Sequence, residues 1–322
     1  GRFFLKSSRV PETDNSQTMD RPYNPLSDFL KARFGCKVFK VSVDAGFTCP
    51  NRDGTRGYGG CVYCESSTLA PKDFNGDFDV GKQLSAGIDK VGKRHNARKF
   101  IAYFQVNTNT HAPVERLRQI YSEALRPDIV GIAVSTRPDC LGKDVLDLLC
   151  ELKEQRHLWL ELGLQSANDS TLKLINRGHS ALEFEDALRR ARERGIDVCA
   201  HVIIGLPGEG REDILKTIGF LASKKIWGVK FHQLQVIKGT GLERMYRNAE
   251  VKVLGLEEYS RLVVDCLERL PRTTVIHRLC GDAPKRYLVA PQWGANKFIV
   301  MDRIRGLLAE RGTFQGARRE GT

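Results

Sequence analysis

The sequence is informative first through what it lacks. Its 322 residues include no uninterrupted run of about 18 apolar residues, the length of a membrane-spanning helix, and no succession of charged, apolar and small residues typical of a secretory signal. The His-Glu-x-x-His motif of zinc proteases, the Gly-Lys-Ser/Thr ending of a phosphate-binding loop and nucleic-acid recognition motifs are also absent. We therefore expect a cytoplasmic protein that has no membrane partner and whose chemistry lies outside these motif classes.

The nine cysteines do not form the pattern of a disulfide scaffold in a chain of this length. Six of them are scattered singly, and we expect these to be small buried apolar side chains: Cys36, Cys140, Cys150, Cys199, Cys266 and Cys280. The other three, Cys49, Cys61 and Cys64, lie in one short glycine-rich loop. Thiols that bind a metal must stay reduced, which is consistent with the cytoplasm.

The charge of the chain is strongly positive, with 51 basic against 39 acidic residues and a net charge of +12. An excess of this kind attracts polyanions, so RNA and phosphorylated metabolites are candidate partners. The arginines within 189–194 lie on a predicted helix, where a solvated helix face is the alternative explanation. The charge alone identifies no particular partner.

Short apolar or β-branched runs alternate with amphipathic segments from Lys37 onward. The runs predict strands near 38–44, 100–106, 129–135, 158–164, 198–204 and 229–236. The amphipathic segments predict helices near 78–95, 113–126, 142–156, 181–194 and 210–224. Ser180 and Glu183 form a candidate capping box for one helix, and Gly195 can close its other end. This alternation is typical of an α/β fold with parallel βαβ units.

The pattern divides the chain into three regions. Residues 1–22 lack hydrophobic periodicity, and we interpret them as a flexible tail without a catalytic role. Residues 23–240 carry the alternation and form the predicted core. In residues 241–322 the pattern predicts an amphipathic helix over 256–270, a strand over 274–279 and a final helix over 301–309. We expect this third region to be an extension that covers the core.

The loop from Cys49 to Cys64 carries the strongest chemical signal. A Cys-x-x-Cys pair alone occurs in zinc, redox and iron–sulfur proteins. A structural zinc site needs four ligands, for which Cys36 is the candidate fourth, whereas a 4Fe-4S cluster on three thiolates leaves one iron open to a small molecule. The glycines at 54, 57, 59 and 60 let the backbone fold closely around an inorganic core and donate N–H groups to its sulfides.

Cysteines on a loop after the first strand, with Tyr63 just before the last of them, resemble the signature of radical S-adenosylmethionine enzymes. Eleven residues separate the first two cysteines. A shorter spacing is usual in that superfamily, and the longer loop is similar to the branch related to the Elongator catalytic subunit. The wording FTCPNRDG followed by GGCVYC resembles the YhcC-like branch. Further matching words are AYFQ at 102–105, TRPDC at 136–140, ELGLQS at 161–166, INRGH at 175–179 and GLPGEG at 205–210.

The resemblance implies a partial (βα)6 TIM-like barrel with a C-terminal α/β extension, in which the carboxyl ends of the strands carry the chemistry. It implies two cofactors: a 4Fe-4S cluster held by Cys49, Cys61 and Cys64, and S-adenosyl-L-methionine bound at the fourth iron. An external one-electron reductant of the flavodoxin or ferredoxin type is then expected. Reductive cleavage of the sulfonium gives a radical that abstracts hydrogen from a substrate.

The resemblance also implies which strand-end residues hold S-adenosylmethionine. Thr108 and Asn109 are candidates for the methionyl amine by position, although the Gly-Gly-Glu wording of many relatives is absent. Arg137 is a candidate for the methionyl carboxylate, because a guanidinium fork matches that group, and a salt bridge at the barrel rim is the alternative. Contacts with the ribose, methionyl or adenine groups are expected from Glu161, Gln165, Ser166, Gly205, Gly208 and Tyr63, for which strand, turn or packing roles are the alternatives.

The catalytic residues and the substrate are not indicated by the sequence. His201, His232 and His277 with Arg278 lie on predicted strands, where a core or rim role is the alternative to a substrate contact. Modification of tRNA is the preferred hypothesis, from the basic charge and the likeness to the Elongator branch, and a small metabolite such as a tetrapyrrole is the competing substrate. A zinc-stabilised RNA-binding protein without catalysis is the alternative of another class.

Overall fold

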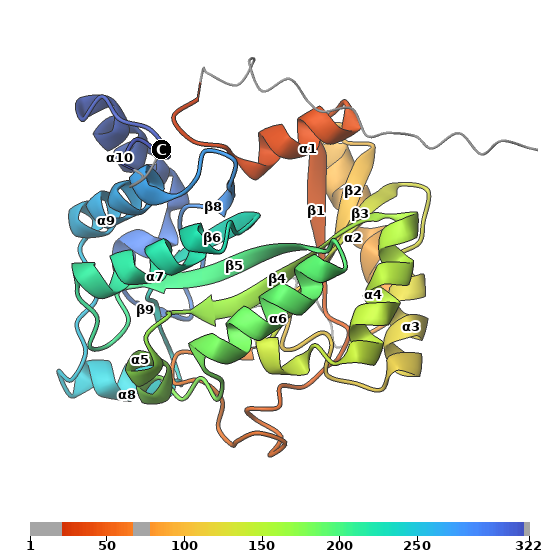
Figure 1. The fold of residues 1–322 in the computed structure, drawn as a ribbon, viewed down its shortest axis with the longest axis horizontal. Helices are drawn as coiled ribbons and strands as arrows, with labels where there is room; N and C mark the ends of the chain where they lie inside the picture. Colours follow the sequence, from red (N-terminus) through yellow and green to blue (C-terminus); the bar gives the residue numbers. More distant parts are fainter. Residues whose placement is uncertain (1–20, 67–77, 319–322) are drawn as a thin grey trace, which may run out of the picture.

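The computed structural model describes residues 21–66 and 78–318, and its centre is a parallel sheet of seven strands. Neighbouring strands follow the order β1-β2-β3-β4-β5-β6-β8, and every pair is parallel. Their bounds are β1 Val38–Val43, β2 Lys99–Phe104, β3 Ile129–Thr136, β4 His157–Gln165, β5 Asp197–Ile204, β6 Gly228–Gln233 and β8 Val275–Arg278. The sheet curls into an open half barrel with helices outside it (Figure 1).

The outer face of the sheet packs against the helices that connect its strands. These helices are α2 (Val80–His95), α3 (Val114–Ser122), α4 (Lys143–Gln155), α6 (Ala181–Glu193) and α7 (Arg211–Ser223). Outward-facing strand positions are apolar and buried, as at Val41, Val134 and Leu160. Because side chains alternate between the two faces of a strand, the neighbouring positions face inward, among them Lys40 and Glu161. The polar strand residues therefore gather inside the half barrel.

The amino ends of the strands are closed by α1 (Leu26–Phe34). Leu26 and Leu30 pack into one apolar group with Trp159 of β4 and Cys199 of β5. Phe29 lies edge-on to the ring of Trp227, with 5.3 Å between the ring centroids. The long loop after β1 extends beyond the opposite end of the sheet from α1 (Figure 1).

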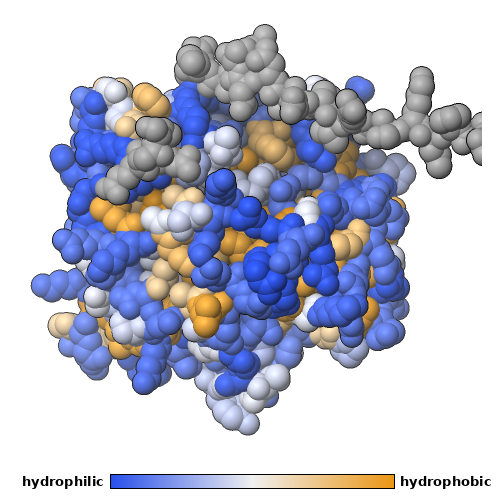
Figure 2. All heavy atoms as spheres, in the orientation of Figure 1, coloured by the Kyte–Doolittle hydropathy of each residue, from blue (hydrophilic) through white to orange (hydrophobic). Residues whose placement is uncertain are grey.

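The residues beyond β6 add a strand to the sheet and cover one side of it. Besides β8 they form the antiparallel pair of β7 (Val236–Ile237) and β9 (Leu288–Ala290). The helices here are α8 (Gly241–Arg247), α9 (Leu256–Arg269), η4 (Gln292–Ala295) and α10 (Lys297–Glu310). Hydrophilic residues cover most of the face drawn in Figure 2, with small hydrophobic groups between them. Within the described residues, no helix has the length and hydropathy of a membrane span.

The structure confirms the predicted (βα)6 half barrel, and the strand expected over 274–279 continues it as β8. The capping box of Ser180 and Glu183 is present at the start of α6, and Gly195 follows that helix with a φ of 64°. Three short helices were not predicted: α1, α5 (Asp169–Leu174) and α8. They are too short for a helical hydrophobic period to stand out. The prediction for residues 1–20 lies outside the described residues.

Candidate functional site: the cysteine loop and the open end of the half barrel

The loop from Cys49 to Cys64, here called the cysteine loop, is closed by its own backbone. Arg52 N donates to Cys49 O (2.7 Å), and Gly60 N donates to Asn51 O (2.8 Å). Gly60 has a φ of 75°, and a Cβ at this position would lie 2.9 Å from Arg52 Nε. Both the conformation and the close approach therefore require glycine, and the loop folds tightly over its own side chains.

Within the cysteine loop, Cys61 and Cys49 both act electrostatically on the thiol of Cys64. Burial, followed by the neighbouring Cys61, raises the pKa of Cys64 to about 11. Cys61 is buried, and its Sγ faces two donors, Asn51 Nδ2 at 3.8 Å and Arg177 Nη1 at 3.6 Å. In the part of the chain that the structure describes, no three His, Cys, Asp or Glu side chains are arranged to hold a single metal ion. Donors aimed at sulfur suit a thiolate that carries negative charge.

A segment that the sequence reasoning missed holds the cysteine loop in place. It comprises residues 175–179, directly after α5, and we call it the clamp segment. Its contacts are Val62 N to Ile175 O (3.0 Å), Asn176 Nδ2 to Gly60 O (2.8 Å), Asn51 Nδ2 to Asn176 O (2.5 Å) and Arg56 Nη2 to Gly178 O (3.1 Å). In the sequence, the INRGH motif of this segment indicated only a resemblance to the family. Its residue types do not predict backbone hydrogen bonds with a distant loop.

Arg177 is the clamp residue whose side chain enters the site. It is buried, Nη2 donates to Gly163 O (2.8 Å), and Nη1 faces Cys61 Sγ. Its Nε is buried and has no hydrogen-bond partner among residues 21–66 and 78–318. Burial disfavours the charged form, but the neighbouring Tyr63 and Cys61 keep the pKa of Arg177 above its usual value. A fixed cation with a spare donor therefore lies beside the cysteine loop.

Thr108 and Asn109, the candidates for the methionyl amine, are buried on the loop after β2. Thr108 N donates to Thr48 O (3.1 Å), which ties this loop to the residue before Cys49. Asn109 Nδ2 donates to Ser135 O on β3 (3.0 Å), whereas its Oδ1 is buried without a partner among the residues described. A spare acceptor thus lies at the same end of the half barrel as the cysteine loop.

Arg137 follows β3 and is held by its own chain. Its Nε and Nη2 donate to the two carboxylate oxygens of Asp139 (2.9 and 3.0 Å), and its Nη1 donates to Arg177 O (2.8 Å). This is the rim salt bridge that the sequence left open as an alternative. It also fixes the backbone of the clamp segment, and a contact with the methionyl carboxylate stays a prediction.

The carboxyl end of β4 contains two further predicted residues. Gln165 has a φ of 73°, rare for a residue with a side chain, at an irregularity in the pairing with β5. Ser166 Oγ donates to Glu209 Oε1 in the loop after β5, and Asn168 N donates to Ser166 Oγ (2.9 Å). Both residues therefore lie at the open end of the half barrel, and Ser166 links two of its loops.

Gly205 and Gly208 form the turn after β5, with φ values of 92° and 80°. A Cβ on Gly205 would lie 3.0 Å from Leu254 Cδ1, so packing as well as conformation requires glycine. Tyr63 packs against an apolar group that includes Leu206, and burial raises the pKa of Tyr63 well above its usual value. The cofactor contacts predicted for these three residues stay predictions.

Glu161 lies within β4, inside the half barrel. Its carboxylate accepts hydrogen bonds from Lys40 (2.6 Å), Lys230 (2.5 Å), His201 (2.8 Å) and Tyr103 (3.0 Å). Burial opposes its charge, but Lys230 and Lys40 hold the pKa of Glu161 well below its usual value. Burial lowers the pKa of His201 to about 3. These partners join β4 to four other strands, β1, β2, β5 and β6, and the predicted cofactor contact of Glu161 is untested.

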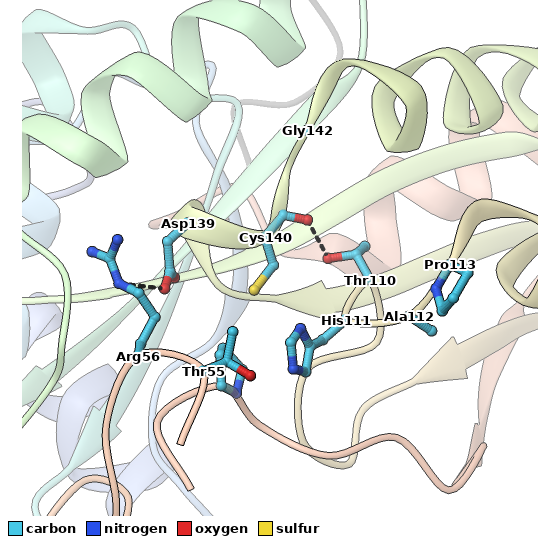
Figure 3. Close-up of a pocket in the computed structure, with 10 residues that line it drawn as sticks. Thr55, Arg56, Thr110, His111, Ala112, Pro113, Asp139, Cys140 and Gly142 are labelled. Atoms are coloured by element: carbon cyan, nitrogen blue, oxygen red, sulfur yellow. Dashed lines mark hydrogen bonds and ion pairs between the residues drawn. The ribbon is translucent and has the colours of Figure 1, made fainter. Parts of the chain in front are cut away.

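A cavity of about 520 Å³ lies beside the cysteine loop (Figure 3). It is lined by Thr55 and Arg56 of that loop, by His111 after β2 and by Cys140 in the short helix η3 (Pro138–Cys140). Figure 3 shows the Cys140 thiol pointing toward Thr55 and His111. Burial raises the pKa of Cys140 to about 12, which keeps this thiol protonated at neutral pH.

Cys36 lies far from the other thiols. It precedes β1, whereas Cys49 follows the opposite end of that strand. A strand of six residues spans about 20 Å. Cys36 therefore does not complete a four-thiolate site with the cysteine loop, and this part of the zinc interpretation is wrong.

Comparisons with known proteins identify the family of the chain. Residues 49–221 match the radical SAM superfamily, and residues 226–310 match the radical SAM C-terminal domain. The chain is 40% identical to YtqA of Bacillus subtilis over 298 residues, which cover 92% of each protein. It is 38% identical to YhcC of Escherichia coli over 291 residues, covering 90% of this chain and 93% of that one.

A solved structure shows the same fold at lower identity. Elp3 of the archaeon Methanocaldococcus infernus, with an N-terminal deletion, superimposes with a TM-score of 0.66 at 20% identity. The match covers 86% of this chain and 64% of that protein, so this chain spans less than two thirds of it.

Proposed function

The chain belongs to the radical SAM superfamily, and we propose that Cys49, Cys61 and Cys64 hold a 4Fe-4S cluster beside which S-adenosylmethionine binds. When bound, this pair supplies one-electron cleavage of a carbon–sulfur bond and thereby a radical that takes hydrogen from a substrate. The electron comes from an external reductant of the flavodoxin or ferredoxin type. The residues of this chain bind and orient the two groups and keep water away from them.

The environment of Cys61 Sγ is the observation that supports this proposal. Asn51 Nδ2 and Arg177 Nη1 both face that sulfur, and the sulfur itself is buried. Donors around a thiolate stabilise its negative charge and tune the potential of a cluster that it ligates. The backbone of the cysteine loop, with glycines in the left-handed region, is compatible with close approach to an inorganic core.

Two unpartnered buried atoms fit the methionyl end of S-adenosylmethionine. Arg177 Nε is a spare donor, and Asn109 Oδ1 is a spare acceptor, both at the open end of the half barrel. An amino acid carries one group of each kind, a carboxylate that accepts and an ammonium that donates. On this proposal Arg177, rather than the fully paired Arg137, is the arginine with capacity to bind the carboxylate.

Anaerobic purification followed by iron, zinc and acid-labile sulfide analysis tests the proposal. We expect about four irons and four sulfides per chain, and formation of 5′-deoxyadenosine from S-adenosylmethionine once dithionite is added. Cys61→Ala should lose both the sulfide and the product. Cys140→Ala is the matched control, since that thiol lies beside the cysteine loop without belonging to it, and should keep both. Zinc without sulfide in the wild-type protein would exclude the proposed cluster.

For the substrate, tRNA remains the preferred class, and one surface feature supports it. Lys238 beside β7 and Lys285 and Arg286 before β9 are exposed, and none of the three has an ion-pair partner in the described part of the chain. They lie close together because Lys238 N donates to Tyr287 O (2.9 Å), and Arg286 stacks on the Tyr287 ring at 4.7 Å. Cations without an ion pair beside a half-buried aromatic ring suit a phosphate backbone with unstacked bases.

Binding of bulk tRNA at several salt concentrations tests this substrate class. Changing Lys238, Lys285 and Arg286 together to Ala should weaken binding about tenfold at moderate salt and flatten the salt dependence. The matched control removes three exposed charges elsewhere, at Arg98, Lys216 and Lys225, and should bind as the wild type does. Equal losses of tRNA affinity in the two triple variants would mean that binding depends only on net charge. Incubation with metabolite extracts would then test the tetrapyrrole-like alternative.

A further inference from the structure

A second polar group lies inside the half barrel, at the carboxyl ends of β6 and β8. Its centre is the pair of His232 on β6 and Arg278 on β8, with Arg278 Nη2 2.8 Å from His232 Nδ1. A guanidinium only donates, so His232 Nδ1 must accept this hydrogen bond. The imidazole of His232 is therefore neutral, and its proton is on Nε2.

This pair presents hydrogen-bond donors that have no acceptor. His232 Nε2, Arg278 Nε and Gln235 Nε2 are each buried without a hydrogen-bond partner among the residues that the structure describes. Such donors are costly to bury and are rare unless a water or a ligand completes them. The set consists of donors, so the missing partner is a group of acceptor oxygens.

The charge of this group points in the same direction. Lys40 and Lys230, the lysines of the interior, both pair with Glu161, whereas Arg278 forms no ion pair with any described residue. Arg278 is half-buried with its Nε buried, and a guanidinium partly withdrawn from water is normally matched by an anion, because desolvating its charge alone is unfavourable. The missing partner is therefore an anion.

Two glycines lie directly against these donors. A Cβ on Gly281 would lie 3.6 Å from Arg278 Nη2 and 3.3 Å from Gln235 Oε1, and a Cβ on Gly294 would lie 3.5 Å from Gln235 Nε2. Neither glycine has a positive φ, so neither is required for the conformation of its own backbone. The nearest atoms to these Cβ positions belong to Gln233, at 3.2 Å from Gly281 and 2.9 Å from Gly294, so the small size of the two glycines lets the amides of Gln233 and Gln235 pack beside Arg278.

The donors also lie at the carboxyl ends of the strands, where a substrate is expected to bind. Leu234, between His232 and Gln235, belongs to the apolar group against which Tyr63 of the cysteine loop packs. The ring of His232 lies tilted against that of His201, with 5.1 Å between the ring centroids, so the group borders the network of Glu161. A ligand held here would lie between that network and the cysteine loop.

We propose that His232, Arg278 and Gln235 form an oxyanion-binding site, which takes a carboxylate or phosphate group of the substrate. Arg278 Nε and His232 Nε2 donate to the oxyanion, and the guanidinium supplies the countercharge. The binding of an oxyanion stands on the contacts above, and its identity as part of the substrate rests on the proposed function. Anchoring one anionic end would orient the rest of the substrate toward the cofactor.

Titration of the anaerobically reconstituted protein with orthophosphate and with acetate, followed by calorimetry and by the ¹⁵N signals of the histidine rings, tests the site. We expect binding of at least one anion and a shift of the His232 Nε2 signal. Arg278→Gln and His232→Asn should each weaken binding at least tenfold, and Asn at 232 still offers Arg278 an acceptor. Arg98→Gln removes an exposed charge far away and should change nothing. Preference for orthophosphate indicates a phosphate-bearing substrate, and preference for acetate a carboxylate.

Thermal stability separates a ligand-binding role from a structural one. If Arg278 only supported the fold, the Arg278→Gln variant would melt at a lower temperature than the wild type. If Arg278 instead awaits an anion, its charge is uncompensated in the free protein, and Arg278→Gln should melt at the same temperature as the wild type or higher. Loss of stability in that variant, or equal anion binding by the wild type and Arg278→Gln, would overturn the proposal.

Failure of this site and failure of the proposed function give different results. Cys61→Ala should still bind the anion, because its change lies outside the site. Arg278→Gln should still form 5′-deoxyadenosine from S-adenosylmethionine in the absence of substrate, because its change leaves the cysteine loop intact. Anion binding without cleavage in the wild type would defeat the cluster proposal alone, and cleavage without anion binding would defeat the oxyanion site alone.

Discussion

The two ends of the half barrel differ in what fills them. At the amino ends of the strands, α1 inserts Leu26 and Leu30 among aromatic side chains such as Trp159. At the carboxyl ends, buried polar atoms of Asn109 and Arg177 have no partner among the described residues. Buried atoms without a described partner also occur at the amino ends, at Arg156 Nε and His157 Nε2. The difference therefore lies in the filling, which is apolar and aromatic at the first end and consists of the cysteine loop and its donors at the second, the division expected of barrels built from parallel strands. The Glu161 network lies between the two, and substitutions on either side of it test whether the division is real.

The largest effect is expected at the boundary itself, from Glu161→Gln. The change removes the carboxylate that compensates Lys40 and Lys230 inside the half barrel, and breaking a buried ion pair from one side costs about 3–5 kcal/mol. Urea unfolding measures the loss. Glu193→Gln, in an exposed pair with Arg189 on α6, is the control and should leave the unfolding free energy unchanged within error. Similar values for the two variants would show that the interior network contributes little.

The next effect belongs to the α1 end. Leu30→Ala deletes a buried side chain from the group that closes the half barrel and should cost about 3 kcal/mol of unfolding free energy. The rate of 5′-deoxyadenosine formation per folded molecule should be unchanged, because Leu30 lies at the opposite end from the cysteine loop. Lys31→Ala on the same helix is exposed and should alter neither quantity. A large loss of rate in Leu30→Ala would mean that the two ends are coupled.

The same division explains which features the sequence could predict. The strands were predictable because parallel strands are buried on both faces, which leaves continuous apolar runs such as 129–135. The cysteine loop stands out in the sequence because three cysteines lie close together among glycines, and the role of these thiols as cluster ligands stays a prediction. Both signals are local, in that neighbouring residues carry them.

The rest depends on contacts between distant segments. The clamp segment binds the cysteine loop through backbone atoms of residues such as Ile175. The side chains of these residues do not predict a contact with a loop more than a hundred positions away. The histidines at 201 and 232 were visible, but their inward direction follows from the register of β5 against β6. The missing partners of Arg278 are defined only by the whole set of neighbours in the fold. The predicted contacts of Thr108, Gln165 and the other cofactor candidates stay predictions.

A smaller effect, confined to activity, is expected at the cysteine-loop end from Arg177→Met. This change removes the donor that faces Cys61 Sγ, and such outer partners of metal ligands change affinity or activity about 10- to 100-fold. Stability should change less, because His179 Nε2 also lies 3.0 Å from Gly163 O, the carbonyl that Arg177 binds. Iron content, the rate of 5′-deoxyadenosine formation and the urea midpoint are measured together. A variant that is mainly unstable would place Arg177 with the structural residues.

The last effect is a change in the pH dependence of stability at the α1 end, which amounts to about 2 kcal/mol over the range from pH 7 to about 5. Burial lowers the pKa of His157 to about 3, so the unfolded chain takes up this proton first as the pH falls below about 6.5. Stability contributed by the neutral ring is therefore complete above pH 6.5 and is lost between about pH 6.5 and 3, at about 1.4 kcal/mol per pH unit. His157→Phe keeps an aromatic ring against Phe29 and Trp159 and should flatten the slope by that amount while leaving 5′-deoxyadenosine formation intact. Urea unfolding of both proteins between pH 7 and about 5 measures the slope, and an unchanged slope would show that His157 is protonated at similar pH in the folded and unfolded chains.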